Sequence, residues 1–335
     1  MKSFKFVYFC FRLVCLTILS FEYWKLKQNI FHIVQSIQQN TMAGIYLHIP
    51  FCKQKCHYCN FFSIASLKQK PDFLAAIKRE IAVQKDYLKD ENVHTIYFGG
   101  GTPSMLDQEE LNSIFDELYK HYNIDPQAEI TLEGNPDDLS KEKLKMLSKT
   151  AVNRLSIGIQ SFFDDDLTYL NRVHSADHAK AVINNALEAG FEKLTIDLIY
   201  GIPTLTDDKW HQNINYFLQT GLKHLSAYAL TVEPRTALAH LIGKGKLEAV
   251  NEQQSASQFE ILMQRMEDEG FIHYEISNFA RANHYSKHNS LYWLGGNYLG
   301  LGPSAHSFNG YSRQWNVSHL NKYIREAGQV ESVFE

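Results

Sequence analysis

The chain has 335 residues, 44% of them hydrophobic and 21% charged, an ordinary globular composition with room for one large domain and an appendage. It carries 33 Lys and Arg residues against 37 Asp and Glu residues, a net charge of −4, so no basic surplus argues for a nucleic-acid partner and none is expected. Two of the five cysteines, Cys10 and Cys15, lie near the N-terminus and the other three share one short motif, so the core domain has no spare cysteine for a structural disulfide.

Residues 1–41 form an N-terminal extension of unusual composition. Residues 4–21 are apolar and aromatic, but Arg12 in their middle would be costly at the centre of a bilayer, and no small-residue cleavage site follows them. We therefore expect Met42 to be the true start of the protein and residues 1–41 to be an upstream over-reading. The alternative is a genuine anchor or targeting segment.

Residues 42–234 repeat one pattern, in which an apolar, β-branched run is followed by a polar loop and an amphipathic helix. Six such units in a row imply a parallel sheet with right-handed crossovers. Six rather than eight favours an open, partial (β/α)6 barrel of the TIM type, with functional residues at the carboxyl ends of its strands. The strands are expected at residues 45–49, 93–98, 129–133, 155–159, 194–200 and 224–230, and the helices at 71–88, 108–121, after an N-cap at Ser140, at 175–189 and at 207–219.

Residues 235–335 are expected to form a small C-terminal α+β domain that covers the open barrel. Helices near 236–243 and 251–269 precede a short strand at 272–276. The following segment, residues 283–311, is rich in Asn, His, Gly and aromatic residues. No closing element is evident at the end of the chain, so we expect part of this domain to be missing.

The loop after the first expected strand contains Cys52, Cys56 and Cys59, with the spacing C-x3-C-x2-C. Three thiolates can hold three corners of a 4Fe-4S cube, which usually has four, so the fourth iron would be open to another ligand. Two alternatives stay open: a structural zinc ion bound by the three cysteines and His57, and ordinary buried cysteines. Because His57 directly follows Cys56, zinc is the weaker of the metal hypotheses.

Further unusual residues follow the other expected strands. The triple glycine at 99–101 allows bare backbone groups to approach a ligand closely, although it would also suit a tight turn. Polar side chains lie along the next three expected strands and the loop between two of them. Glu133 ends the third strand, Gln160 follows the fourth, Arg172 lies in a later loop and Asp197 lies within the fifth strand. Taken singly, these side chains are equally consistent with surface acids and a structural salt bridge, but their shared position indicates one site.

From Ala43 to about residue 320 the chain resembles the radical S-adenosylmethionine superfamily, and within it the group of oxygen-independent coproporphyrinogen III oxidases and their relatives. The matching pieces are residues 45–52, the cysteine motif, and residues 99–103, 133–136, 157–162 and 197–203. The resemblance implies that Cys52, Cys56 and Cys59 hold a 4Fe-4S cluster. It also implies a set of residues that position S-adenosylmethionine: Tyr46, Gly100, Gly101, Thr102, Glu133, Gln160, Arg172 and Asp197.

Two details distinguish branches of this group. The true oxidases carry a further cysteine two residues after the third, where this chain has Phe61. The haem-chaperone branch lacks that cysteine and carries a His-Asn-x-x-Tyr-Trp motif, which is matched here by His288, Asn289, Tyr292 and Trp293. The resemblance therefore implies haem binding at this motif, with His288 as the axial ligand and His284 or His306 as alternatives. A capping loop with core aromatic residues is the structural alternative.

The expected function is that of a cytoplasmic haem chaperone, which binds haem, a 4Fe-4S cluster and S-adenosylmethionine and passes haem to an acceptor protein. An electron donor such as flavodoxin or ferredoxin and a homodimer are the further partners that the resemblance implies, with membrane association only if residues 1–41 are real. The first alternative is a coproporphyrinogen III oxidase, which decarboxylates propionates by radical chemistry. The second is a zinc-binding module without redox chemistry.

Overall fold

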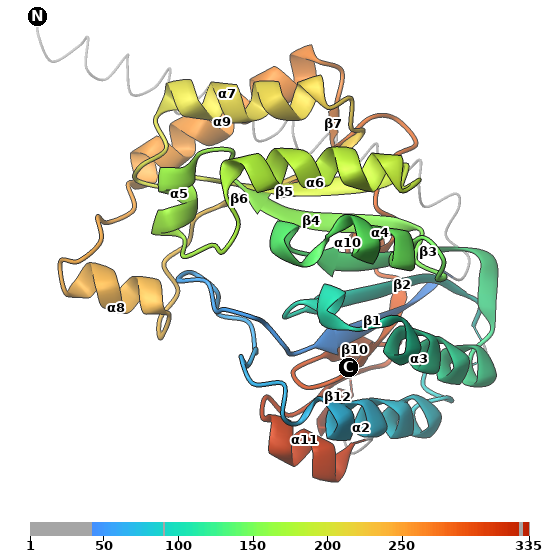
Figure 1. The fold of residues 1–335 in the computed structure, drawn as a ribbon. Coiled ribbons are helices and arrows are strands. Elements are labelled where there is room, and N and C mark those ends of the chain that lie inside the picture. The colour runs from blue at the N-terminus through green and yellow to red at the C-terminus, as the bar shows by residue number, and fades with distance from the viewer. Residues whose placement is uncertain (1–41, 90, 328–330, 335) are drawn as a thin grey trace, which may run out of the picture. The chain divides into compact units, whose positions relative to one another are not determined.

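The computed structural model describes residues 42–89, 91–327 and 331–334, and for the last four it describes the backbone alone (Figure 1). The predictions for residues 1–41 lie outside these residues. One sheet runs through the described chain in the order β12-β11-β10-β9-β1-β2-β3-β4-β5-β6-β8-β7. Its strands are β1 (Ala43–Ile49), β2 (Val93–Gly100), β3 (Ile124–Gly134), β4 (Arg154–Gln160), β5 (Lys193–Tyr200), β6 (His224–Ala229), β7 (Ile272–His273), β8 (Asn278–Ala280), β9 (Asn297–Leu301), β10 (His306–Phe308), β11 (Ser312–Trp315) and β12 (Glu331–Phe334).

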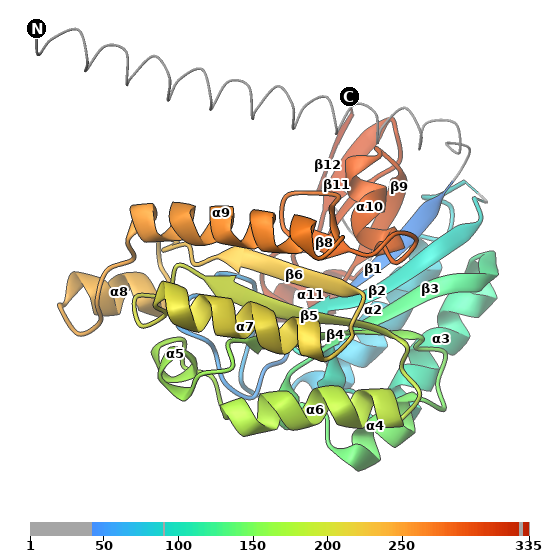
Figure 2. The same ribbon diagram turned by 90° about the horizontal axis from the view of Figure 1, so that it is seen from above.

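Strands β1 to β6 pair in parallel in chain order, as the repeated strand–helix pattern predicts. The helices between them cover one face of the sheet (Figure 2). The described helices are α2 (Lys70–Val83), α3 (Gln108–His121), α4 (Lys141–Leu147), α5 (Asp164–Tyr169), α6 (Ala176–Glu188), α7 (Asp207–Gln219), α8 (Ala237–Gly243), α9 (Glu252–Asp268), α10 (Lys287–Trp293) and α11 (Leu320–Glu326). The predicted N-cap of α4 is confirmed, because the Ser140 hydroxyl accepts from the backbone N–H of Lys143.

Three predicted elements are wrong in extent. The third strand begins at Ile124 rather than residue 129. Helix α2 ends at Val83 rather than residue 88, and the chain continues in turns to Lys89, whose φ is +49°. Leu88 is buried but lies in a turn, so its apolar spacing from the helix correctly indicated burial and wrongly indicated a helix. Of the expected strand at 272–276 only the first two residues form a strand, β7. A bend follows, in which Glu275 accepts from the backbone N–H of Ser277, and β8 begins beyond the predicted range.

Strands β3 to β6 alternate between a polar and an apolar face, as successive side chains on a strand must point to opposite sides. The apolar face belongs to the hydrophobic core under the outer helices, and its residues include Leu132, Leu155, Ile157, Ile196, Leu225 and Ala227. The polar face lines a cavity through Thr131, Glu133, Arg154, Ser156, Thr195, Asp197, Ser226 and Tyr228. The barrel therefore has a polar interior, and its stability comes mainly from the sheet–helix layer.

The C-terminal residues extend both edges of the same sheet. Strand β9 pairs in parallel with β1, and β8 pairs antiparallel with β6. Helix α10 packs on β1 and β2, on the face opposite the outer helices (Figure 2). The sheet is thus continuous across residue 234, and the predicted domain division there stays a prediction.

Over the part of the chain that the structure describes, none of the helices combines the length and apolar character needed to cross a bilayer.

Candidate functional site at the carboxyl ends of the strands

The cysteine loop leaves the end of β1 and returns beside it. The backbone N–H of Cys52 donates to the carbonyl of Ile64 (3.0 Å), and the N–H of Ile64 donates to the carbonyl of Pro50 (2.8 Å). A bridge between Phe51 and Ile64 completes this closure. The three cysteines therefore lie on a loop with a fixed base at the carboxyl end of the first strand.

Two sets of contacts hold the loop against its neighbours. Lys53 forms ion pairs with Asp137 (3.3 Å) and with Asp138, both of which follow β3. On the other side, Asn171 donates to the Lys55 carbonyl (2.9 Å) and accepts at its own carbonyl from Gln54 (3.0 Å). The loop is thus tied to the segments that follow β3 and α5.

His57 points to that second segment. Its backbone N–H donates to the carbonyl of Leu170 (3.1 Å), and its ring Nδ1 lies 3.0 Å from the carbonyl oxygen of Tyr169. The imidazole thus contacts the end of α5 by hydrogen bonding. This contact disfavours the alternative of a zinc ion bound by the three cysteines and His57.

The thiols of Cys52, Cys56 and Cys59 are free and half-buried. Burial raises the pKa of Cys52 and of Cys59. Two cationic or hydroxyl donors reach the sulfurs: the Thr102 hydroxyl lies 3.4 Å from Cys52 Sγ, and Arg172 Nη1 lies 3.2 Å from Cys56 Sγ. Such donors stabilise thiolates and sulfur ligands of a cluster.

Among the described residues no three His, Cys, Asp or Glu side chains converge on a point that would hold one metal ion. A four-iron cube places each cysteine on a different iron, so it needs a loop with three sulfur positions rather than one shared point. The free thiols and their donors fit that requirement.

Arg172 connects the cysteine loop to two strand ends. Its Nη2 donates to the Asn135 side chain (2.6 Å) after β3 and to the Gly158 carbonyl (2.8 Å) in β4. Asn135 in turn donates to the Thr102 hydroxyl (3.2 Å). Within the described structure the buried Nε of Arg172 has no hydrogen-bond partner, so one donor of the guanidinium is left for a ligand.

The glycine turn after β2 fits tightly against the start of the cysteine loop. Gly100 has φ +103°, and a Cβ on it would lie 2.5 Å from His48 Nδ1. A Cβ on Gly101 would lie 2.7 Å from the carbonyl oxygen of Ile49, to which the Gly101 N–H donates (2.8 Å). Only glycine allows this approach, and the turn therefore presents bare backbone at the mouth of the barrel.

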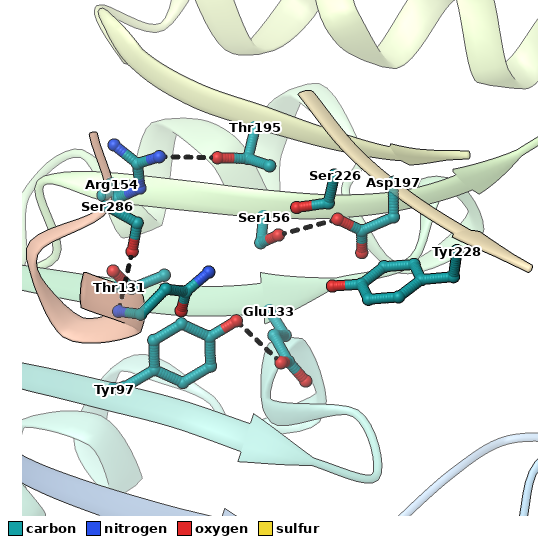
Figure 3. Close-up of a pocket in the computed structure, with 11 residues that line it drawn as sticks. Tyr97, Thr131, Glu133, Arg154, Ser156, Thr195, Asp197, Ser226, Tyr228 and Ser286 are labelled. Carbon is teal, nitrogen blue, oxygen red and sulfur yellow. Dashed lines mark hydrogen bonds between the residues drawn. The ribbon is translucent and has the colours of Figure 1, made fainter. Parts of the chain in front are cut away.

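Two carboxylates face the interior cavity (Figure 3). Glu133 accepts from the Tyr97 hydroxyl (2.8 Å) and from the Gly100 N–H (3.2 Å), and burial raises its pKa to about 7. Asp197 accepts from the Ser156 hydroxyl (3.1 Å), and burial raises its pKa to about 6. Neither acid has an ion-pair partner within hydrogen-bond reach among the described residues, so the cavity suits a ligand with positive charge and hydroxyl groups.

Gln160 ends β4 in an unusual backbone conformation. Its φ is +70°, in the left-handed region that residues other than glycine rarely adopt, and the pairing with β5 shifts register between Gly158 and Gln160. A Cβ on Gly158 would lie 2.8 Å from Gln160 Nε2 and 3.3 Å from Arg172 Nη2. The bulge therefore turns the Gln160 amide beside the guanidinium, at the same rim of the barrel.

His288, the first residue of the His-Asn-x-x-Tyr-Trp motif, is buried inside the barrel. Ser286 caps α10 by accepting from the Asn289 N–H (3.3 Å), and the N–H of His288 donates to Glu129 (3.2 Å). His288 is 1% exposed; its Nδ1 is hydrogen-bonded to Thr95 (2.8 Å) and its Nε2 to Tyr292 (2.9 Å). Burial lowers its pKa to about 3.

The other three residues of the motif face in different directions. Asn289 lines the interior cavity together with Glu133 and Asp197. Tyr292 is 41% exposed and Trp293 is 49% exposed, so their rings offer surface to solvent. The motif thus spans from the polar cavity to an aromatic surface. In this arrangement both imidazole nitrogens of His288 are engaged, and its role as haem ligand stays a prediction.

The structure brings the residues predicted to bind the cluster and S-adenosylmethionine to one end of the barrel, and it places His288 deeper. It also adds residues that the sequence analysis missed. Tyr97 donates to Glu133, and Thr95 is hydrogen-bonded to His288. Asn135 is hydrogen-bonded to both Arg172 and Thr102. The alternation of Thr95 and Tyr97 with apolar residues in β2 is the signal that could have found the first two.

Comparisons with known proteins agree with this architecture. A family model described as the radical SAM superfamily matches residues 46–217. The chain is 40% identical over 285 residues to the heme chaperone HemW of Bacillus subtilis, covering 84% of this chain and 75% of that protein. It is 39% identical over 284 residues to HemW of Mycobacterium tuberculosis, covering 84% and 73%.

One solved structure shares the fold at lower identity. The coproporphyrinogen III oxidase HemN from Escherichia coli, described as a radical SAM enzyme, superposes with a TM-score of 0.74 at 24% identity. The match covers 86% of this chain and 69% of that one. The likeness confirms the partial-barrel fold.

Proposed function

The chain belongs to the radical SAM superfamily and, within it, to the HemW family of haem chaperones, and from this premise we propose that it binds haem and transfers it to an acceptor protein. The family implies a 4Fe-4S cluster and S-adenosylmethionine as cofactors. The observation that carries the proposal is the extent of the HemW match, at 40% identity over 84% of the chain. Phe61, in place of the further cysteine expected of the oxidases, supports it; this side chain is 64% exposed at the end of the cysteine loop.

In this proposal Cys52, Cys56 and Cys59 hold the cluster. When bound, the cluster and S-adenosylmethionine supply reductive cleavage of the sulfonium, and the protein supplies binding, orientation and exclusion of water. Thr102 and Arg172 donate to the cysteine sulfurs and keep two of them oriented. These contacts belong to the chain itself and lower the cost of placing thiolates in a half-buried loop.

The residues around the loop would position S-adenosylmethionine. Glu133 would accept from an ammonium group and Asp197 from ribose hydroxyls, a proposal supported by their shared cavity. The free Nε of Arg172 suits a carboxylate. The remaining residues assigned to this pocket contribute backbone, an amide and ring surface at the rim: Tyr46, Gly100, Gly101, Thr102 and Gln160.

For haem we propose the surface formed by Tyr292 and Trp293. Asn289, in the same helix, lines the cavity. Both rings are about half exposed, and aromatic rings pack well against a macrocycle. His288 belongs to the same motif, and binding of iron by its imidazole would require the hydrogen bond to Tyr292 to break.

Further partners follow from the same proposal. A reduced cluster needs an electron donor, for which flavodoxin or ferredoxin is the class we propose, and a haem chaperone needs an acceptor. A homodimer is part of the proposal as well. We place the protein in the cytoplasm, where reductant is present and a low-potential cluster is protected from oxygen.

Replacing Cys56 with alanine tests the cluster assignment. We expect the variant to assemble no cluster after anaerobic reconstitution, because one of three ligands and the acceptor of Arg172 are lost. Iron and sulfide analysis with absorption spectroscopy measures this. An iron content equal to that of the wild-type protein would contradict the three-thiolate assignment.

The same anaerobic wild-type sample tests the function. Haem titration is expected to give saturable binding and a Soret band that transfers to an added acceptor. Incubation with S-adenosylmethionine, reductant and coproporphyrinogen III is expected to give no protoporphyrinogen. Formation of that product in the absence of haem binding would replace the chaperone proposal with the oxidase.

A further inference from the structure

His288 lies under the acid side of the barrel pocket, at the junction of three aromatic rings. We propose that His288 is a positioning residue, which holds Tyr97 and through it the Glu133 carboxylate in the geometry that binds S-adenosylmethionine. The inference rests on the proposed function for the identity of the ligand. It assigns to the imidazole a task other than binding haem iron.

The first support is the state of the imidazole. Its two nitrogens are occupied by Thr95 (2.8 Å) and Tyr292 (2.9 Å), and its side chain is 1% exposed. One of these nitrogens carries the proton and has no lone pair for iron, and the lone pair of the other accepts a hydrogen bond, so iron could bind only if that bond broke. The ring is thus fixed from both sides by residues of β2 and α10.

The second support is the packing of the rings. The His288 ring lies 5.0 Å from that of Tyr97 at an interplanar angle of 27°, and Tyr46 lies 6.1 Å from Tyr97 and 6.4 Å from His288. The three rings form a triangle contributed by β1, β2 and α10. Offset contacts of this kind fix the position of a ring that could otherwise turn about its side-chain bonds.

The third support is the contact between this triangle and the acid. The Tyr97 hydroxyl donates to Glu133 Oε1 at 2.8 Å. A Cβ on Gly99 would lie 2.9 Å from the Tyr46 ring, 3.0 Å from the Tyr97 ring and 3.1 Å from Glu133 Oε1. The rings and the carboxylate therefore meet at one crowded point, where a displaced Tyr97 would displace Glu133.

The backbone of His288 is anchored as firmly as its ring. Its N–H donates to Glu129 (3.2 Å), a buried acid that also lies 3.7 Å from Arg154. Arg154 donates in turn to Thr195 in β5 (2.8 Å; Figure 3). The N-terminus of α10 is thus fixed to three strands, and the imidazole enters the barrel at a set depth.

The test compares full-length, anaerobically reconstituted variants by their dissociation constant for S-adenosylmethionine. His288→Ala is expected to weaken binding about tenfold, the size of one lost hydrogen bond to a charged group, with unchanged iron content. His288→Phe keeps the ring and is expected to restore affinity to within about twofold. Lys287→Gln, at an exposed position of the same helix, is the matched control and is expected to bind S-adenosylmethionine as the wild type does.

Tyr97→Phe gives a readout that a general loss of stability would not move. It keeps the ring and removes one donor from Glu133, so the pH midpoint of S-adenosylmethionine binding is expected to shift upward. The other titratable groups that face Glu133 are Asp197 and the phenols of Tyr46, Tyr228 and Tyr292. Tyr97→Phe also tests the proposed positioning of Glu133 if His288→Ala does not fold.

Unchanged affinity for S-adenosylmethionine in His288→Ala and Tyr97→Phe would overturn the inference. A His288→Phe variant that binds S-adenosylmethionine as poorly as His288→Ala would overturn it as well, as would wild-type protein that binds no S-adenosylmethionine. Haem titration of the same samples separates the proposals, because a wild-type protein that binds S-adenosylmethionine but no haem refutes only the chaperone function. A Soret band that stays unchanged in His288→Phe is the expected result.

Discussion

At the scale of single residues, Glu133 shows a conflict between stability and binding. This half-buried carboxyl group accepts two hydrogen bonds and has no ion-pair partner among the described residues, and burial raises its pKa to about 7 from the ordinary 4.5. A folded-state pKa above that of the unfolded chain means that the folded state holds the proton more tightly. Stability therefore falls as pH rises from about 4.5 to about 7. The ionised carboxylate therefore destabilises the protein without ligand, whereas the proposed binding of S-adenosylmethionine requires it.

Replacing Glu133 with glutamine separates the two effects. At pH 8 we expect the cluster-free variant to be more stable than the wild type by about 1–3 kcal/mol, because a buried charge is removed. The difference should shrink toward pH 5, where the wild-type acid is neutral. Urea unfolding at the two pH values measures it.

The same variant is expected to bind S-adenosylmethionine at least about tenfold more weakly after reconstitution, since a neutral amide replaces the charged acceptor. Glu192→Gln, at an exposed position before β5, is the control for both measurements. A Glu133→Gln protein less stable than wild type at pH 8 would show that the carboxylate is well compensated in the empty pocket.

At the scale of elements, the cysteine loop depends on its attachments. Lys53 pairs with Asp137 and Asp138, and the Asp138 side chain is 4% exposed. Loss of the lysine would leave a buried acid with one remaining side-chain donor, Asn135. The loop would then keep its attachment to the segment after α5 and lose the one after β3.

Lys53→Ala is therefore expected to loosen the loop with little change in global stability. Because the lysine itself is half exposed, the change in the free energy of unfolding should stay below about 1 kcal/mol. The cluster absorption should bleach several-fold faster when an iron chelator is added. Lys141→Ala, which removes an exposed pair with Glu188 (3.4 Å), is the control. Equal bleaching rates would mean that the attachment to Asn171 suffices.

Elements were predictable from the sequence where the signal is local. The apolar runs predicted β1 to β6, and the polar residues toward their carboxyl ends include Glu133 and Asp197, which line one cavity. The position of α10 was not predictable, because seven residues with an N-cap specify a helix but not the face of the sheet on which it packs. The burial of His288 against Thr95 was therefore not predictable either, because Thr95 lies 193 residues earlier in the chain.

At the scale of the whole molecule, the C-terminal strands depend on one buried acid in α2. Glu80 accepts from the N–H of Gly302 (2.8 Å), from Asn316 and from the Tyr323 hydroxyl (2.6 Å), and so joins α2 to the end of β9 and to α11. The sequence gives no sign of this, because a glutamate in an amphipathic helix normally faces water. Its partners come 222 to 243 residues later, and only the folded sheet brings them together.

Because of this junction, we expect the hydrogen bond from Tyr323 to Glu80 to contribute more to the free energy of unfolding at alkaline pH than at acidic pH. Burial raises the pKa of Glu80 to about 7, although its three donors favour the ionised form. Tyr323→Phe removes one donor, so at pH 8 a buried carboxylate is left with two. We expect a loss of about 1–3 kcal/mol there, and a smaller loss at pH 5, where the acid is neutral and its hydrogen bond is weaker.

Urea unfolding of Tyr323→Phe at the two pH values measures the effect, and Tyr119→Phe, at a ring that is 52% exposed in α3, is the control. Hydrogen exchange locates it, since amides of β9 and α11 should lose protection before those of β2 to β5 if Glu80 joins them to the rest of the sheet. A destabilisation that is the same at pH 5 and pH 8 would assign Tyr323 a packing role alone, and would leave the parallel pairing of β9 with β1 as the main attachment of the C-terminal strands.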